Sequence, residues 1–138
     1  TDLLFLVDED TNAFNKIIDG FRMPKSTPEE VKIRKEAIEN ATKYATEIPF
    51  KVMETAYNSM EVMMIMAKKG IQNSLSDAGV GALCARTAVV GAYFNVRINA
   101  KDIKDRAFAE EILFKAKEIY NKTNSLENEM IQLIDSKI

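Results

Sequence analysis

The chain has 138 residues, the length of one domain, and its 46% hydrophobic and 29% charged content is typical of a globular protein. A net charge of −2 and the lack of a basic stripe argue against nucleic acid as a partner. The chain has no histidine and one cysteine, which excludes histidine-based catalysis, an internal disulfide and a cysteine-based zinc site. We therefore expect one domain over residues 1–138, in a reducing compartment.

The first segment, "TDLLFLVDEDTNAFNKIIDGF", has apolar residues at helical spacing. Asp10 falls on this apolar face between Val7 and Phe14, whereas Asp8 and Glu9 point away from it. A buried carboxylate needs a cationic partner, a proton or a cavity, so Asp10 either pairs with an arginine or lysine or lines a site. The segment begins like the middle of a helix, and we expect the natural protein to continue upstream.

The second helix has a strong start signal, because Thr27 precedes Pro28 and Glu30 completes a capping box. Pro49 provides no N–H for the carbonyl of Ala45, which predicts a kink or a restart. The "KKG" sequence predicts a helix end with a left-handed cap at Gly70. The predicted buried face contains small, aromatic and methionine side chains: Val31, Ala37, Ile38, Ala41, Tyr44, Ala45, Ile48, Met53, Ala56, Tyr57, Met60, Met63, Met64 and Ala67.

A third helix is predicted over residues 76–97, and its sequence is almost entirely apolar. It is a membrane span, a packed core helix or the wall of a binding site, and the central Arg86 argues against the span. Its alanines and glycines allow either close approach of a neighbouring helix or room for a flat ligand. Asp77 is either a charge favoured at the helix start or a functional carboxylate, and Arg86 is either an ion-pair partner or an anion-binding group.

The last helix, from about residue 103 to the end, has apolar residues alternating at spacings of three and four. They are Ala109, Ile112, Ala116, Ile119, Thr123, Leu126, Met130 and Leu133. This helix is long enough that we expect part of the seam to face another subunit. Strand-like alternation is absent from the sequence, so the predicted fold is all-α, a bundle of long antiparallel helices.

Three stretches, "LVDEDTNAFNKIIDGFRMPK", "ATEIPFKVMETA" and "NSLSDAGVGALCARTAVVGAYFNVRIN", resemble the formiminotetrahydrofolate cyclodeaminase family, which also contains methenyltetrahydrofolate cyclohydrolases. The resemblance covers nearly the whole chain in the same order. It implies an all-α, homodimeric, cytoplasmic enzyme that binds a folate with one or more glutamates in its tail. It implies no cofactor beyond the tetrahydrofolate substrate, no metal and no membrane.

The implied reaction converts 5-formiminotetrahydrofolate to 5,10-methenyltetrahydrofolate and ammonia, a step in histidine breakdown. On this basis Asp77 and Asp10 are the candidate catalytic carboxylates. The candidates for orienting the substrate are Ser76, Arg86, Asn95 and Arg97, with Lys101 and Lys104 also suited to the glutamate tail.

The sequence departs from the family in one respect, since the family begins with additional helices that carry a glycine-rich "PGGGS"-like segment. We therefore expect N-terminal helices to be missing from this sequence. Two alternatives stay open: a cyclohydrolase of the same family, which adds water to the methenyl carbon, and a non-catalytic helical dimerisation scaffold.

Overall fold

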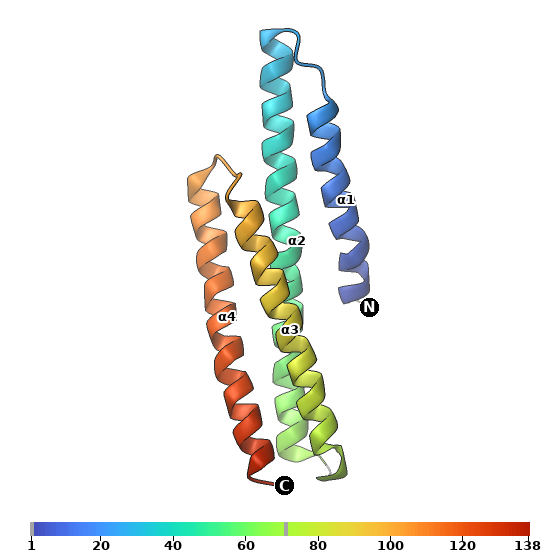
Figure 1. Ribbon diagram of the computed structural model, residues 1–138, viewed down its shortest axis with the longest axis vertical. Coiled ribbons are helices and arrows are strands. Elements are labelled where there is room, and N and C mark those ends of the chain that lie inside the picture. Colours follow the sequence, from blue (N-terminus) through green and yellow to red (C-terminus); the bar gives the residue numbers. More distant parts are fainter. Residues whose placement is uncertain (1, 71) are drawn as a thin grey trace.

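Four long helices form the molecule, and each runs antiparallel to the one before it (Figure 1). The computed structural model describes residues 2–70 and 72–138. The helices are α1 (Asp2–Arg22), α2 (Pro28–Lys69), α3 (Leu75–Ala100) and α4 (Arg106–Asp135), with a 3-10 turn, η1 (Gln72–Ser74), before α3. The described residues contain helices and no strand, which confirms the all-α prediction.

The longest helix, α2, packs against each of the other three. Figure 1 shows α1 along the N-terminal part of α2, while α3 begins beside the C-terminal end of α2 and α4 runs next to α3. The main core lies where α2, α3 and α4 meet, and a second cluster lies near the C-terminal end of α2. A third, smaller cluster joins α1 to α2. The side chains that are at most 1% exposed in the main core are Met53, Ala56, Val89, Val96 and Ala116.

The start of α2 matches the prediction. The Thr27 hydroxyl accepts a hydrogen bond from the backbone N–H of Glu30 at 3.2 Å, and the Glu30 carboxylate accepts one from the N–H of Thr27 at 3.1 Å. The end of α2 differs from the prediction, because Gly70 is extended, with φ of −75°, and is not left-handed. Its N–H donates to the carbonyl of Met66 at 2.6 Å, so the last turn closes without a left-handed residue.

Pro49 does not restart the helix, which corrects that part of the prediction. The helix is continuous over 42 residues with Pro49 inside it. The carbonyl of Ala45, which loses its intrahelical donor, accepts a hydrogen bond from Nδ2 of Asn99 at 2.9 Å. A side chain of α3 therefore replaces the missing backbone donor.

The first helix packs through a different face from the predicted one. Its buried residues are Leu6, Ala13 and Gly20, seven residues apart, whereas Val7 and Phe14 are each 61% exposed. Small residues let α1 approach α2 closely, since a Cβ added to Gly20 would lie 3.0 Å from Cγ1 of Ile38. Gly20 is therefore a packing position near the end of α1.

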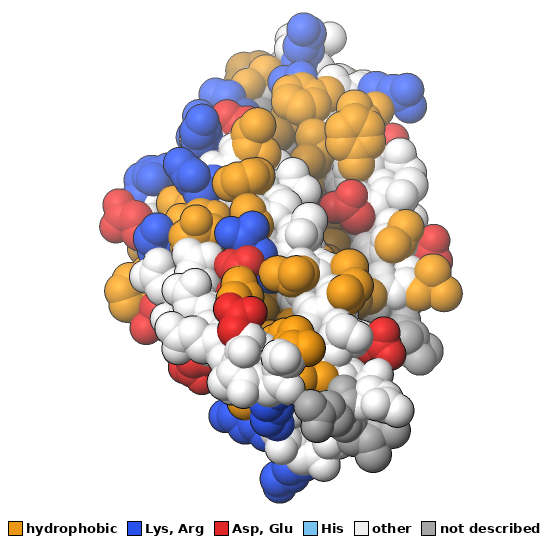
Figure 2. Space-filling model, turned by 60° about the horizontal axis from the view of Figure 1, so that its bottom comes forward, with side chains coloured by type: hydrophobic (Ala, Val, Ile, Leu, Met, Phe, Trp, Pro, Cys, Tyr) orange, Lys and Arg blue, Asp and Glu red, His pale blue; other side chains and the backbone are white. Residues whose placement is uncertain are grey.

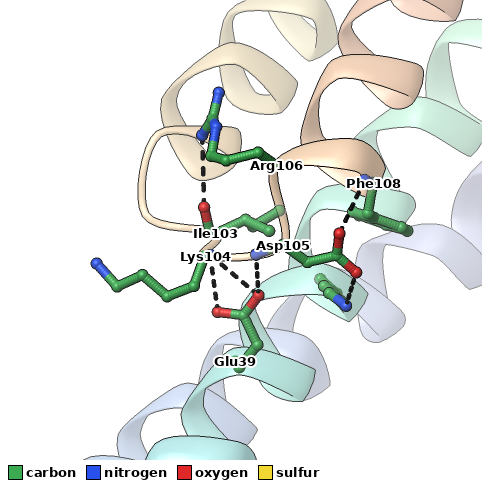
Figure 3. Close-up of polar contacts among 7 residues, drawn as sticks. Glu39, Ile103, Lys104, Asp105, Arg106 and Phe108 are labelled. Atoms are coloured by element: carbon green, nitrogen blue, oxygen red, sulfur yellow. Dashed lines mark hydrogen bonds and ion pairs between the residues drawn. The ribbon is translucent and has the colours of Figure 1, made fainter.

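The start of α4 is held by α2 (Figure 3). The Glu39 carboxylate accepts hydrogen bonds from the backbone N–H groups of Lys104 and Asp105 at 3.0 Å. Asp105 caps α4 by accepting from the N–H of Phe108 at 3.2 Å and pairs with Lys43 at 2.7 Å. These contacts satisfy donors that a helix start leaves open.

The predicted seam of α4 is confirmed, because all of its residues are buried or half-buried within this chain. The seam packs on α2 and α3, and the expectation that part of it also faces another subunit stays a prediction. Large apolar residues are exposed on all four helices, and most of them lie on α1, α2 and α3.

Candidate functional site

The six predicted site residues lie on two helices. Ser76 and Asp77 are in the first turn of α3, Arg86 is near its middle, and Asn95 and Arg97 are in its last third. From Ser76 to Arg97 is a rise of about 30 Å along a helix. Asp10 is on α1, which lies along the other end of α2 from the start of α3 (Figure 1). Within one chain the structure does not gather these residues around one small pocket.

Asp10 is exposed, so the prediction of a core-facing carboxylate is wrong. The neighbouring acid, Glu9, faces α2 instead and accepts hydrogen bonds from the Tyr44 hydroxyl and from Nδ2 of Asn12. The reason is that α1 packs through its row of small residues, which rotates the predicted face away from α2. Burial therefore gives no support to a function of Asp10, and its catalytic role stays a prediction.

Asp77 is also exposed, at a position where the helix dipole favours a negative charge. Ser74, the residue at the N-cap position, makes no side-chain capping hydrogen bond. The start of α3 thus has backbone donors without a serine cap and an acidic residue in its first turn. Both interpretations of Asp77, dipole partner and functional carboxylate, are compatible with this geometry.

Arg86 forms an ion pair between α3 and α4. Its Nε lies 3.0 Å from Oε2 of Glu127, and the two side chains are 36% and 20% exposed. Of the two alternatives for Arg86, the ion pair is the one present in the structure. Sequence analysis missed Glu127, although its place beside Leu126 of the heptad seam is typical of residues that pair across helices.

A mostly apolar cavity of about 270 Å³ opens beside this ion pair, near the C-terminal end of α2. Its polar groups are Ser76, Glu127 and Asp135. The volume is near the lower end of the range for ligand pockets, enough for a ring system. Ser76, a predicted site residue, therefore lines the same cavity as Glu127, which forms an ion pair with Arg86, another predicted site residue. The apolar wall consists of Met60, Gly79, Val80, Ala82, Leu83, Met130, Ile131 and Ile134.

A second polar group lies toward the other end of α3, where two tyrosines stack between α3 and α4. The ring centroids of Tyr93 and Tyr120 are 4.8 Å apart. The Arg97 guanidinium lies 5.5 Å from the centroid of Tyr93, and the Lys117 ammonium lies 4.7 Å from that of Tyr120. Arg97 and Lys117 thus place two cations on one aromatic platform, whereas Asn95 is exposed nearby on α3.

Five groups have shifted pKa values, and three of them are Glu9, Tyr44 and Tyr57. The hydrogen bond with Tyr44 lowers the pKa of Glu9 and raises that of Tyr44. Burial, together with Glu61, raises the pKa of Tyr57. Each shift moves the pKa of the group further from 7, so none of these three groups is suited to act as a general acid or base near pH 7.

Residues 2–70 and 72–138 contain no group of three acidic or cysteine side chains placed to hold a metal ion. By length and composition α3 is apolar enough to cross a membrane, but core helices of bundles meet the same test. Here α3 packs on α2 and α4, and its central Arg86 is paired with Glu127.

The fold and the polar groups along α3 define a class: an all-α antiparallel bundle whose core helix is rich in small residues and bears charged groups at its start, middle and end. Residues 1–118 match the sequence model described as formiminotransferase-cyclodeaminase, and the chain belongs to this family.

Relatives and a solved structure agree with this assignment. The chain is 33% identical over 133 residues to a methenyltetrahydrofolate cyclohydrolase of Methylorubrum extorquens, covering 96% of this chain and 64% of that protein. It is 39% identical over 110 residues to the formimidoyltransferase-cyclodeaminase of Gallus gallus, covering 80% of this chain and 20% of that protein. The structure of a formiminotetrahydrofolate cyclodeaminase from Thermotoga maritima superposes with a TM-score of 0.83 at 23% identity, over 97% of this chain and 63% of that one. The chain thus spans just under two thirds of the cyclohydrolase and of the solved structure.

Proposed function

We propose that this chain belongs to a cytoplasmic folate enzyme that converts 5-formiminotetrahydrofolate to 5,10-methenyltetrahydrofolate and ammonia, in histidine breakdown. The observation that supports the proposal most directly is the family match over residues 1–118, with 39% and 38% identity to the formimidoyltransferase-cyclodeaminases of Gallus gallus and Mus musculus.

The reaction needs proton transfer and little else from the protein. N10 of the folate attacks the formimino carbon and loses a proton, while the formimino nitrogen gains protons and leaves as ammonia. Carboxylates perform such transfers in a chain without histidine. Asp77, exposed in the first turn of α3, is our first candidate, and Asp10 is the second.

The apolar cavity beside Ser76 and Glu127 suits a flat ring. Its wall offers contact area for a pterin, and the carboxylates of Glu127 and Asp135 are acceptors for amino and ring N–H groups. Because Glu127 also binds Arg86, that arginine acts on the ligand by holding the carboxylate in place.

The glutamate tail of a folate requires cations. Arg97 and Lys117 share the Tyr93–Tyr120 platform, and Lys101 and Lys104 follow in the turn after α3. Arginine and lysine bind carboxylates through charge-assisted hydrogen bonds. We therefore assign the tail to this end of α3.

A homodimer is part of the proposal. On α3 the side chains of Val80, Leu83, Phe94 and Ile98 are 45% to 61% exposed, and on α1 those of Phe5, Val7, Phe14 and Phe21 are 56% to 62% exposed. Figure 2 shows hydrophobic side chains at the surface of one face, with charged side chains between and around them. Apolar surface on this scale is typical of an interaction site.

A methenyltetrahydrofolate cyclohydrolase is the second candidate function. The specific observation in its favour is that the match covers 64% of the cyclohydrolase of Methylorubrum extorquens, against 20% of the Gallus gallus protein. In that reaction water adds to the methenyl carbon.

One assay separates these functions. The purified full chain is mixed with 5-formiminotetrahydrofolate, and the methenyl product is followed by absorbance while released ammonia is measured. Methenyl product with equal ammonia supports the cyclodeaminase. Turnover of methenyltetrahydrofolate alone supports the cyclohydrolase, and a full-length, dimeric protein, with the N-terminal helices expected upstream, that turns over neither substrate contradicts both and favours the scaffold.

A further inference from the structure

Pro49 leaves an open acceptor in the middle of α2. Proline has no N–H, so the carbonyl of Ala45, four residues earlier, has no donor within the helix. Ala45 is 7% exposed, so water has little access to this carbonyl. A buried backbone acceptor without a partner is strongly unfavourable, and most helices with an internal proline kink at that point.

Asn99, on α3, donates a hydrogen bond to this acceptor of α2. Its Nδ2 donates to the carbonyl of Ala45 at 2.9 Å, across 54 residues of sequence. Asn99 itself is half-buried in the last turns of α3. The contact is directional, and it forms only when this part of α3 lies beside the turn of α2 that Pro49 opens.

The apolar contacts around it are far less selective. The core between α2 and α3 contains several small or flexible side chains, among them Met53, Ala56 and Ala92. In addition, α3 is apolar on its exposed side, where Phe94 and other large residues face outward. The hydrophobic effect is non-directional. Burial of apolar area therefore does little to favour one rotation of α3, or one position of α3 along α2, over another.

We propose that Pro49 and Asn99 form a polar lock that selects the register and the face with which α3 packs on α2. A shift of α3 by two turns would move Asn99 about 11 Å and leave the Ala45 carbonyl unsatisfied. A single buried asparagine selects register in coiled coils by the same physical means. The hydrogen bond between Asn99 and the carbonyl that Pro49 leaves open thus favours one register of α3 on α2, which the apolar core does not do by itself.

A double-mutant cycle on the full chain tests the lock. Asn99→Ala, Pro49→Ala and the double variant are compared with the unaltered chain by urea unfolding, with Asn128→Ala, an exposed asparagine of α4, as the control. We expect Asn99→Ala to raise the unfolding equilibrium constant about tenfold or more, because it leaves a buried acceptor unpaired. In the Pro49→Ala background, where the new N–H serves Ala45, the same change is expected to alter the constant less than about threefold.

Each outcome of the double-mutant cycle either supports or contradicts the proposed lock. Equal effects of Asn99→Ala in the two backgrounds overturn the lock. If Asn99→Ala does not fold, Pro49→Ala must restore folding, and failure to do so also overturns it. The cycle measures unfolding and requires no turnover, so a negative folate assay leaves its result unaffected.

A second variant tests register selection apart from stability. Asn99→Leu fills a similar volume without a donor. We expect doubled or broadened amide resonances along α3 in its ¹H–¹⁵N spectrum, whereas Asn128→Leu keeps one sharp set. One sharp set with unaltered shifts in Asn99→Leu contradicts selection of register by Asn99.

Discussion

At the scale of single residues, the side chains that the sequence marked as candidates for chemistry have surroundings that it did not predict. Arg86, a candidate for anion binding from sequence, is held by Glu127 of α4. Asp10, predicted to face the core, is exposed, while Glu9 contacts Tyr44. Residue types and spacing identified which side chains are chemically interesting, but the rotation of each helix decides their partners, and a rotation of one residue changes the acid that faces α2.

The Arg86–Glu127 pair predicts a measurable coupling between α3 and α4. Both side chains retain some solvent access, so we expect Arg86→Ala and Glu127→Ala to couple by about 0.5–1 kcal/mol in the free energy of unfolding. Urea unfolding of the two single variants and the double variant measures this value. Strictly additive effects would show that the pair contributes no stability, and added salt should reduce the coupling.

Asp77 predicts a loss of activity without a loss of stability. Because Asp77 is exposed, Asp77→Asn should leave the urea midpoint nearly unchanged. If Asp77 transfers a proton in the reaction, kcat falls by about 100-fold or more. Steady-state assays of Asp77→Asn beside Asp19→Asn, an exposed acid of α1, make the comparison. Equal turnover by the two variants would remove Asp77 from the mechanism.

At the scale of the elements, helix starts were predictable and helix packing was only partly so. The capping box of α2 and the seam of α4 are local patterns, and both are present in the structure. The predicted restart at Pro49 is wrong, since α2 continues through it, and Asn99, distant in sequence, supplies the missing donor. The cavity beside Ser76 was likewise beyond sequence reasoning, since it depends on how three helices meet.

The docking of α1 on α2 is expected to depend on pH. The pKa of Glu9 is lowered in the folded chain by the Tyr44 hydrogen bond, then by Asn12. A lowered carboxyl pKa stabilises the folded state above the ordinary value of 4.5, and this stabilisation is lost as pH falls through the folded value. The raised pKa of Tyr44 has the opposite sign, so its contribution is present below pH 10 and is lost as pH rises through the folded value.

Hydrogen exchange can follow this dependence. Relative to α4, and after correction for the intrinsic exchange rate, the amides of α1 should lose protection as pH falls below about 4.5. Tyr44→Phe should remove most of this pH dependence, while Tyr120→Phe, whose ring stacks on Tyr93, should retain it. The same dependence in both variants would exclude the Glu9–Tyr44 contact as its cause.

At the scale of the whole molecule, the all-α bundle and the family were predictable from sequence, whereas the outward side of α3 was not. That helix is apolar nearly all round, so its sequence does not say which side is covered. In the structure only a third of its most apolar window is buried. The exposed remainder, with the outer side of α1, is the surface we assign to a second copy of the chain.

Self-association should therefore depend on α3. Phe94→Lys on the exposed side is expected to weaken dimerisation at least about tenfold while leaving the folded monomer intact, because Phe94 is 57% exposed. Phe114→Lys on α4, where the side chain is 65% exposed, is the matched control. Light scattering after size exclusion measures both. A dimer unaffected by Phe94→Lys, or a monomeric unaltered chain, contradicts the assignment.

The contacts at the start of α4 also constrain the order in which the chain folds. The acceptor for the N–H groups of Lys104 and Asp105 is Glu39, which precedes them by 65 and 66 residues. We expect the first turn of α4 to be completed only after α3 has docked on α2, because that docking brings Glu39 close to these N–H groups and shortens the loop that must close. A ribosome-bound chain that already displays α2 would meet α3 and α4 in that order, so vectorial synthesis presents each helix to a partner that is already formed.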